Sequence, residues 1–403
     1  MPEALRIIHN AMRLAQKYGQ PIYLVGGAVR DLLLNHQAID IDLVLEGDAL
    51  DTAQQLASTT GSAVTLHSEF HTAKLHLPSF NLDLASARSE YYQCSGDLPV
   101  VSPADIRTDL RRRDFSINAM AISLNAENYG QLLDECGGLS DLQERLIRVL
   151  HQQSFRDDAT RMWRAVRYEQ RLNFRIERTT EVLLKQDLSM LNSISGERLW
   201  YELECIFGET QPEKALLRAN ELGLLRYIHP QLTCNHMLGR WHKHAQQLSL
   251  PQKPAMGLYL ALLLYNLEAA ECEETIESLK LSKNLSRTLR DSIQIKASFA
   301  ALENSILSPS FVYRSLYNYD PIAIKANLIV SESANTRRHI QLYLEQLRDV
   351  KPILNGNDLL ALGIKSGPSI STALNRLLNA RLDGEISSRE DEILWVEQHR
   401  WLL

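Results

Sequence analysis

The segment YLVGGAVRDL, residues 23–32, runs from a short apolar stretch through two glycines into a helical pattern. A strand that ends at Gly26 and Gly27 lets the backbone approach a ligand closely, and the helix that follows offers its first N–H groups to an anion. Arg30 falls in the first turn of that helix, where its guanidinium could meet a phosphate. The segment is neither a Walker A loop nor a G-x-G-x-x-G fingerprint, so it predicts a phosphate-binding turn of another kind.

The neighbouring segment IDIDLVL, residues 39–45, has the composition of a strand and carries two carboxylates. Side chains two apart on a strand point to the same side, so Asp40 and Asp42 project together. Paired carboxylates repel unless a cation lies between them, and such oxygen ligands suit Mg²⁺. A D-x-D pattern alone would favour two solvent-exposed acids on a strand edge. The glycine turn upstream favours a metal site instead. We predict that Asp40 and Asp42 hold magnesium, with Asp83 in the β-like run NLDLA, residues 81–85, as a third catalytic carboxylate.

The pattern of the chain changes after about residue 125. Before that point, short runs rich in β-branched or alternating apolar residues are bounded by turn formers, at residues 21–27, 38–47, 62–68, 72–78 and 80–86. From about Asp141 onward the apolar residues follow helical spacing. The first 19 residues also predict an amphipathic helix, whose apolar face would carry Leu5, Ile8, Met12 and Ala15. The sequence therefore predicts an α+β fold, with a mixed sheet and helices in the head and an all-helical remainder.

Length, charge and cysteine content bound the class of protein. A chain of 403 residues is expected to form two to four domains. The net charge is −6, yet Arg145–Arg178 contains nine arginines and four acidic residues, a local balance of +5. Such a block predicts a localised phosphate site, although an arginine-rich helix can also be only a solvated face. The five cysteines are scattered and no apolar run could span a bilayer, so we expect a cytoplasmic protein without a membrane partner.

These segments, together with four more, resemble the class II tRNA nucleotidyltransferases, the family of CCA-adding enzymes and bacterial poly(A) polymerases with a polymerase-β-like head. The further matches are DLRRRDFSINAMA (109–121), DECGGLSDL (134–142), DDATRMWRAVR (157–167) and SGERLWYEL (195–203). A last segment, GNDLLALGIKSGP (356–368), is similar to the tail of bacterial members. The resemblance implies a catalytic head at 1–140, a neck with a nucleotide-selecting helix at 141–210, a helical body at 211–335 and a helical tRNA-binding tail at 336–403.

The resemblance also implies roles for residues of the first two motifs. Gly27 and Arg30 would bind the triphosphate. Arg113 and Asp114 lie together in a polar stretch ahead of a helical run, and an arginine–aspartate pair can contact a triphosphate oxygen and a ribose hydroxyl at once. The family uses this motif to choose ribonucleotides.

The motif at 157–167 would select the base. If 157–171 is one helix, one broad face carries Asp157, Arg161, Arg164, Arg167 and Arg171, and the opposite face carries Met162, Trp163 and Val166. In the family this helix pairs with the incoming base in place of a template. Asp158 and Arg161 match its template residues, with Arg164 and Arg167 nearby, because arginine donates to cytosine and a carboxylate accepts from an exocyclic amino group. The usual Glu-Asp is Asp157-Asp158 here, which leaves a role for Asp157 in question.

The implied activity is the Mg²⁺-dependent transfer of CMP and AMP from CTP and ATP to the 3′ end of tRNA, with release of pyrophosphate. The tRNA acceptor arm would be held by the helical remainder. CC-only and A-only addition are alternatives, and the loop from Arg88 to Asp105 argues against CC-only addition. Poly(A) polymerase is less favoured because strongly basic extensions are absent. An inactive tRNA-binding homologue is the non-enzymatic alternative, and the intact pair Asp40 and Asp42 speaks against it.

Overall fold

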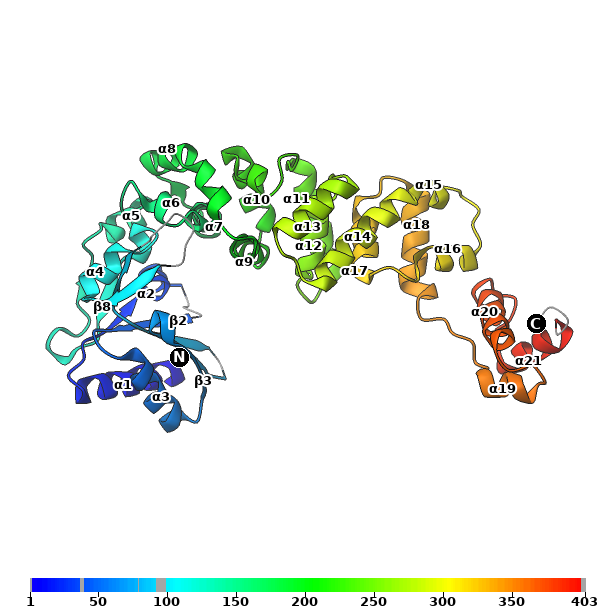
Figure 1. Ribbon diagram of the computed structural model, residues 1–403, viewed down its shortest axis with the longest axis horizontal. Helices are drawn as coiled ribbons and strands as arrows, with labels where there is room; N and C mark the ends of the chain where they lie inside the picture. Colours follow the sequence, from blue (N-terminus) through cyan, green and yellow to red (C-terminus); the bar gives the residue numbers. More distant parts are fainter. Residues whose placement is uncertain (1, 37–39, 79, 92–98, 400–403) are drawn as a thin grey trace. The chain divides into compact units, whose positions relative to one another are not determined.

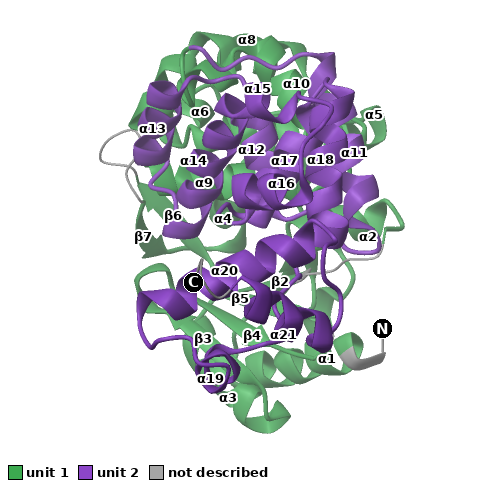
Figure 2. Cartoon of the chain, turned by 90° about the vertical axis from the view of Figure 1, so that its right-hand side faces the viewer, with its two compact units in different colours: residues 1–230 green, residues 231–403 purple. Residues whose placement is uncertain are grey.

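The computed structural model describes residues 2–36, 40–78, 80–91 and 99–399, and it forms two compact units, Met1–Pro230 and Gln231–Leu403 (Figures 1 and 2). Ile39 and residues 92–98 of the loop considered above lie outside the described residues. Within the described residues, no helix combines the length and the apolar content that crossing a bilayer needs. The division of the sequence into head, neck, body and tail stays a prediction.

A mixed seven-stranded sheet with the order β3-β4-β5-β2-β1-β8-β9 organises the first unit. Its strands are β1 (Ile22–Val25), β2 (Asp40–Leu45), β3 (Ala63–His67), β4 (Thr72–His76), β5 (Asn81–Ser86), β8 (Ala121–Ser123) and β9 (Leu132–Leu133). β2 and β5 pair in parallel, and the other neighbours pair antiparallel. All five short runs that the sequence predicts as β-type contain a strand of this sheet, so the predicted α+β head is confirmed.

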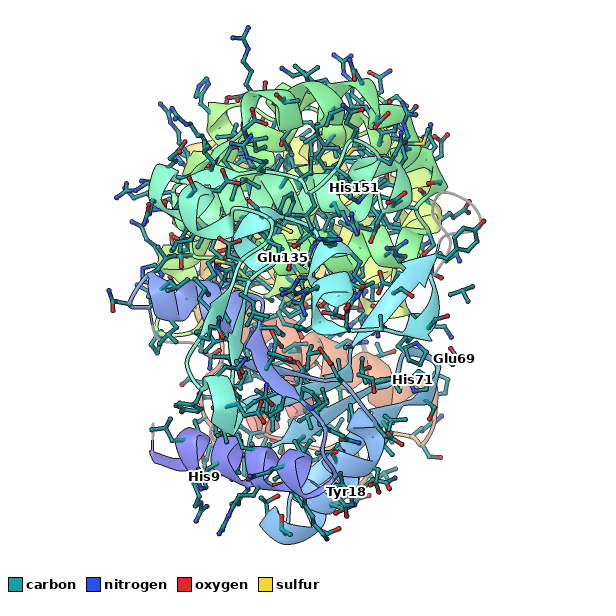
Figure 3. The ribbon with its side chains drawn as sticks, turned by 90° about the vertical axis from the view of Figure 1, so that its left-hand side faces the viewer. His9, Tyr18, Glu69, His71, Glu135 and His151 are labelled. Atoms are coloured by element: carbon teal, nitrogen blue, oxygen red, sulfur yellow. The ribbon has the colours of Figure 1, made fainter. Side chains whose placement is uncertain are left out.

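Helices α1 (Pro2–Lys17) and α3 (Ala49–Thr60) cover one face of the sheet (Figure 1). They pack on the apolar side of β2, where Ile41 and Leu43 are buried. The prediction for α1 is partly wrong, because Leu5 is 61% exposed and Ile7 with Ala11 enters the core instead. His9 and Tyr18 of this first segment are also exposed (Figure 3). The residues of β2 that alternate with Ile41 and Leu43 therefore point to the opposite face of the sheet, which α1 and α3 do not cover.

The remainder of the first unit is mostly helical. Its helices are α2 (Gly27–Leu33), α4 (Ile106–Arg111), α5 (Gly138–Glu144), α6 (Ser154–Asp157), α7 (Thr160–Leu172), α8 (Arg178–Gln186), α9 (Gly196–Phe207) and α10 (Pro212–Leu222). Two small sheets accompany them, the antiparallel pair β6 (Arg88–Tyr91) and β7 (Val100–Pro103) and the parallel pair β10 (Leu146–Ile147) and β11 (Arg175–Ile176).

The segment predicted as one helix over 157–171 is broken. α6 ends at Asp157, Asp158 is extended with φ −145° and ψ 103°, and α7 begins at Thr160. The break has a local cause, because Oδ1 of Asp158 accepts from the backbone N–H of Thr160 at 3.0 Å and from its hydroxyl at 2.7 Å. An aspartate that bonds the N–H two residues on favours a helix start over a helix interior.

The described part of the second unit contains helices and no strand. Its helices are α11 (His236–Ser249), α12 (Met256–Leu264), α13 (Ala269–Ser278), α14 (Lys283–Ala297), α15 (Phe299–Leu302), α16 (Pro309–Leu316), α17 (Pro321–Val330), α18 (Ala334–Leu342), α19 (Gly356–Ala361), α20 (Pro368–Leu382) and α21 (Arg389–Gln398). α14, α16, α17 and α18 contribute to one apolar core, and α19 to α21 enclose a separate one. The expected helical remainder is therefore confirmed.

Candidate active site

A cavity of about 920 Å³ lies in the first unit, between the sheet and helices α7 and α9. Most of the residues predicted from the sequence line it, although they come from distant parts of the chain. These are Gly27, Arg30, Asp42, Arg113, Asp114, Asp158, Arg161, Arg164 and Arg167. Asp83 is not among the lining residues, and the side chain of Asp40 lies outside what the structure describes.

The glycine turn brings β1 and α2 close to the acidic strand. Gly26 has φ 68° and ψ −135°, and its N–H bonds the carbonyl of Met120 at 3.2 Å. A Cβ at this position would lie 2.8 Å from Nη1 of Arg113 and 3.5 Å from Oδ2 of Asp42. Only glycine fits both the backbone conformation and the space. The turn therefore keeps an arginine and a carboxylate together at the cavity.

The carboxylates of β2 and β5 are placed by strand register. Asp42 pairs with Asp83, and Asp40 pairs with Asn81. Asp83 lies 3.3 Å from Nζ of Lys74, and its side chain is 39% exposed. Of the two carboxylates whose side chains the structure describes, Asp42 lines the cavity and Asp83 does not. The register is compatible with the predicted carboxylate group, and Lys74 contacts one of the two carboxylate oxygens of Asp83.

The donor chemistry of this edge fits a divalent cation. Asp42 offers hard oxygen atoms beside the open glycine turn, and Asp40 stands two residues earlier on the same strand. Among the described residues, no group of three His, Cys, Asp or Glu side chains could hold a metal. Mg²⁺ does not need such a group, because it usually takes one or two carboxylates and completes its shell with waters and substrate phosphates.

Arg30 is buried with 2% exposure, and its donors are directed by the protein. Nε and Nη2 contact Oδ1 of Asp31 at 2.9 and 2.8 Å, and Nη1 donates to Oδ1 of Asn118 at 2.6 Å. The guanidinium also lies 5.3 Å from the ring centroid of Tyr168. These contacts fix a positive charge at the end of the cavity that the glycine turn forms.

An ion-pair network supports the segment that carries Arg113. Asp109 is fully buried, and it accepts from Arg112 at 2.6 Å and from Arg113 at 3.0 Å. Burial opposes the charged form of Asp109, but Arg113 and Arg112 outweigh it and hold its pKa below the usual range. Arg112 also donates to Glu90 of β6 at 2.7 Å, and Glu90 accepts from Arg88. The strand pair β6–β7 is thereby linked to the segment that carries Arg113.

Asp114 is buried and fully engaged. Its Oδ2 accepts from Nε and Nη2 of Arg164 at 2.9 and 2.7 Å. Its Oδ1 accepts from the N–H of Phe115 at 2.8 Å and from Nδ2 of Asn118 at 3.0 Å. Burial opposes ionisation, but Arg164 and the Asn118 hydrogen bond keep the pKa of Asp114 below its usual range. This carboxylate therefore stays charged at neutral pH.

The arginines of α7 differ in how much of each is available to a ligand. Arg161 is 5% exposed and donates to the hydroxyl of Ser154 at 2.7 Å and to the carbonyl of Arg112 at 2.8 Å. Its Nη1 and Nη2 atoms therefore donate hydrogen bonds to other residues of the protein. Arg164 has a side chain 30% exposed. Burial opposes the charge of Arg164, but Tyr168 and Asp114 outweigh it and hold its pKa above the usual value.

The opposite face of α7 is apolar as predicted, since Met162, Trp163 and Val166 are fully buried. Asp157, which the single-helix prediction placed with the arginines, does not line the cavity. It lies in α6, and its Oδ2 is 3.6 Å from Nε2 of His151. Asp158 does line the cavity, and Nη2 of Arg198 contacts its Oδ1 at 2.8 Å.

Sequence reasoning left several lining residues without a role. Asn118 and Arg198 belong to quoted motifs, and both contact a predicted site residue directly. Glu202, from the same motif as Arg198, lies between two arginines of α7 at 4.0 and 3.8 Å. Tyr168 lies beneath three guanidiniums at 5.1 to 5.5 Å. Helical spacing could have indicated Tyr168, which follows Arg164 by four residues, whereas the other contacts depend on the tertiary fold.

Two family models match the chain. The first, described as the poly A polymerase head domain, covers residues 22–148. The second, described as a probable RNA and SrmB-binding site of polymerase A, covers residues 173–235. The first match therefore contains the glycine turn, the acidic strand and the segment with Arg113, and the second contains α8 to α10.

Whole-chain relatives extend this likeness. An A-adding tRNA nucleotidyltransferase of Geobacter sulfurreducens is 38% identical over 93% of this chain, and the match spans 44% of that relative. One of Halalkalibacterium halodurans is 32% identical over 98% of this chain and 92% of the relative. A CCA-adding enzyme of Lactobacillus johnsonii is 26% identical over 98% of this chain and 97% of the relative. This chain thus spans less than half of the Geobacter protein.

Solved structures of CCA-adding enzymes have the same fold. An apo form is 33% identical with a TM-score of 0.82, covering 100% of this chain and 96% of the other. The Thermotoga maritima enzyme complexed with tRNA is 32% identical with a TM-score of 0.77, covering 99% and 96%. A complex with ATP is 30% identical with a TM-score of 0.80, covering 100% and 96%.

The mixed sheet, its acidic strand and the arginine-lined cavity define a polymerase-β-like nucleotidyltransferase head. Together with the similarity to whole-chain relatives, these features show that the chain belongs to the class II tRNA nucleotidyltransferase and poly(A) polymerase family. Members of this polymerase-β-like family typically depend on a divalent metal.

Proposed function

We propose that the chain is an A-adding tRNA nucleotidyltransferase, which transfers AMP from ATP to a tRNA that ends in CC. The observation that carries the transfer chemistry is the cavity where Gly26, Asp42 and Arg113 meet beside the arginines of α7. The names of the relatives support the A-adding repertoire, because A-adding proteins are 38% and 32% identical and the CCA-adding enzyme above is 26% identical. The sequence alone favoured CCA addition.

The site residues supply positioning and charge neutralisation in this proposal. Asp42 and Asp40 would hold Mg²⁺, which neutralises developing charge on the phosphates. Arg30 and Arg113 would contact triphosphate oxygens, and Asp114 would accept from a ribose hydroxyl. The tRNA 3′ hydroxyl would lose its proton to solvent as its oxygen forms a bond to the α-phosphorus of ATP, and pyrophosphate would leave with the electrons of the broken P–O bond.

Base choice would depend on α7 and the residue before it. Asp158 lines the cavity, and its carboxylate would accept a hydrogen bond from the exocyclic amino group of adenine. Nη1 and Nη2 of Arg161 donate to the protein, and the residue also lines the cavity, where a remaining N–H of its guanidinium would contact the base. Arg164 and Arg167 are the further donors on the same face.

CCA addition is the second candidate. It is favoured by the solved CCA-adding structures, which are 33% and 32% identical over almost the whole chain. Binding of the tRNA acceptor arm by the second unit is part of both candidates. The two differ only in whether CTP is also a substrate.

Three tRNA transcripts test the proposal, one ending before the first C of the tail, one after C and one after CC. Each is incubated with Mg²⁺ and either CTP or ATP, and the products are resolved at single-nucleotide length. We expect one added A on the CC-ending transcript and no other extension. CTP addition to the shorter transcripts would establish CCA addition instead, and long A tails would indicate poly(A) polymerase. No extension of any transcript would overturn the enzymatic assignment.

A further inference from the structure

Asp114 has no acceptor site left for a ribose hydroxyl. A carboxylate has about four lone-pair sites. Two bonds from Arg164 occupy Oδ2, and the N–H of Phe115 with Nδ2 of Asn118 occupies Oδ1. The contacts at Oδ1 are local and buried. Arg164 is therefore the partner that must move before Asp114 can accept from a nucleotide.

Glu202 is a second anionic partner for Arg164 in the same cavity. It is 4% exposed, and its Oε2 is buried without a hydrogen-bond partner. Its Oε1 lies 4.0 Å from Nη1 of Arg164, just beyond bonding distance, and Oε2 lies 3.8 Å from Nη2 of Arg167. A buried acceptor that lacks a hydrogen bond is destabilised, because it has lost water without gaining a partner. The structure therefore holds an unmet acceptor next to the arginine that blocks Asp114.

Tyr168 provides a surface on which Arg164 can move between the two carboxylates. The guanidinium of Arg164 lies 5.5 Å from the ring centroid, and its Nη2 is 3.3 Å from the tyrosine hydroxyl. The ring is itself fixed, with 9% exposure and an edge contact to Phe115 at 5.9 Å. A guanidinium keeps its attraction to a ring face over a range of positions within about 6 Å. The side chain of Arg164 is 30% exposed, so it has room to turn.

We propose that ATP binding transfers Arg164 from Asp114 to Glu202, which frees Asp114 for the ribose hydroxyl. Glu202 is then a positioning residue that contributes to the choice of ATP over dATP. This inference rests on the proposed nucleotide-binding function of the cavity. Burial raises the pKa of the Glu202 carboxyl, and Arg164 and Arg167 only partly offset that effect. The movement of Arg164 to Glu202 would therefore also stabilise the negative charge of the Glu202 carboxylate, which burial destabilises in the site without nucleotide.

The hydrogen bond from the ribose hydroxyl compensates for the bonds that Asp114 loses when Arg164 moves. A hydrogen bond to a charged carboxylate replaces the pair that Asp114 loses, and the bonds to Glu202 replace those that Arg164 loses. A deoxyribose cannot replace the bond at Asp114. With dATP, Arg164 therefore stays on Asp114, and the nucleotide binds without the exchange.

The test compares Glu202→Gln with Glu209→Gln in the full-length chain. Glutamine keeps the size of the side chain but accepts a weaker hydrogen bond from Arg164. Glu209 lies 3.7 Å from Arg167 and is absent from the residues that line the cavity, so it controls for loss of a neighbouring charge. Calorimetry measures ATP and dATP binding without RNA, and thermal melting checks that each variant is folded.

We expect Glu202→Gln to weaken ATP binding about tenfold and to leave dATP binding within about twofold, because one charge-assisted bond is lost. KM for ATP would rise with kcat largely kept, and Glu209→Gln would match the wild type. An unchanged ratio of ATP to dATP affinity in Glu202→Gln would overturn the inference.

A second background separates positioning from general damage. In Arg164→Met no arginine blocks Asp114, so adding Glu202→Gln should change the ATP to dATP ratio by less than about twofold. The same loss in both backgrounds would also overturn the inference. Failure of the proposed function is distinguishable, because wild-type chain that binds ATP but extends no tRNA would refute the transfer reaction and leave the binding result standing.

Discussion

At the residue scale, Gly26 sets how closely the backbone approaches Arg113 and Asp42. We predict that Gly26→Ala lowers the rate of nucleotide addition at least tenfold. The added Cβ would lie 2.8 Å from Nη1 of Arg113, so the guanidinium must shift and weaken the 3.0 Å bond from its Nη2 to Asp109. The positive φ also costs about 1–3 kcal/mol of stability in any residue with a Cβ. Incorporation of AMP into tRNA and thermal melting measure the two effects.

Gly130→Ala is the matched control for backbone strain. Gly130 has φ 81°, and a Cβ there would meet nothing within 4 Å. It should lose stability like Gly26→Ala but keep the wild-type rate of addition. Equal losses of activity in the two variants would show that strain, and not the approach of Arg113, explains the result.

Local motifs allowed the sequence to predict part of the site at this scale. Gly26, Arg30 and Asp42 could be predicted because a strand, a turn and a helix start lie within a few residues of one another. The partners of these residues could not, since Asn118 is 88 positions from Arg30 in the chain. The role of Glu202 depends on how α9 packs against α7, which periodicity does not specify. Contacts of this kind need the tertiary fold.

At the element scale, the break between α6 and α7 shows the limit of periodicity. Helical spacing continues through Asp158, so the pattern predicts one helix. The side chain of Asp158 instead bonds the N–H and hydroxyl of Thr160, and this local competition wins. The arginine face of α7 was still predicted correctly, because the break lies N-terminal to Arg161.

The network around α4 predicts an acid-sensitive first unit. The pKa of Asp109 is lowered in the folded chain, so the unfolded chain binds the proton more tightly. Its contribution is present above the ordinary aspartate pKa of about 3.9 and is lost as pH falls through the folded value. We expect Asp109→Asn to cost roughly 2 kcal/mol near pH 7 and progressively less below about pH 4. Denaturant unfolding at several pH values measures this, and a cost that grows on acidification would contradict it.

Glu392 holds the last three helices together. It is fully buried and accepts from the N–H of Leu354 at 2.7 Å, from that of Ile353 at 2.9 Å and from Nη1 of Arg381 at 2.9 Å. Glu392→Gln should destabilise this group by about 2–3 kcal/mol, because charge-assisted bonds are lost in a buried site. Hydrogen exchange of Leu359 and Leu377 reports the loss. Glu390→Gln, on the exposed side of α21, should leave exchange unchanged.

At the scale of the whole molecule, the change from β-type runs to helical spacing predicted the sequence of architectures. It could not predict that the first compact unit extends to Pro230. α7 packs against α10, which lies in the predicted body, and against β10 and β11, which lie in the predicted neck. All of these elements belong to the same compact unit as the seven-stranded sheet. Long-range packing of this kind leaves no periodic signal in the sequence.

The two units predict a separation of tasks. All lining residues of the nucleotide cavity belong to the first unit. A groove of about 530 Å³ in the second unit has Lys325, Arg337 and Arg338 among its lining residues, together with apolar side chains and Glu345. We expect a fragment of residues 1–230 to bind ATP within about threefold of the full chain. The fragment should need a tRNA concentration at least about tenfold higher than the full chain for half-maximal extension, because phosphate contacts dominate nucleic-acid affinity. Calorimetry and extension assays measure the two, and undiminished tRNA affinity would contradict the division.

The most direct measurement is the single-turnover rate of AMP incorporation into a CC-ending tRNA by Asp42→Asn and by the wild-type chain with Mg²⁺. Asparagine keeps the shape of the strand residue and removes the charge that a divalent cation needs. We predict a rate at least about a hundredfold lower, with the melting temperature and the sheet preserved. Undiminished incorporation by Asp42→Asn would contradict the account.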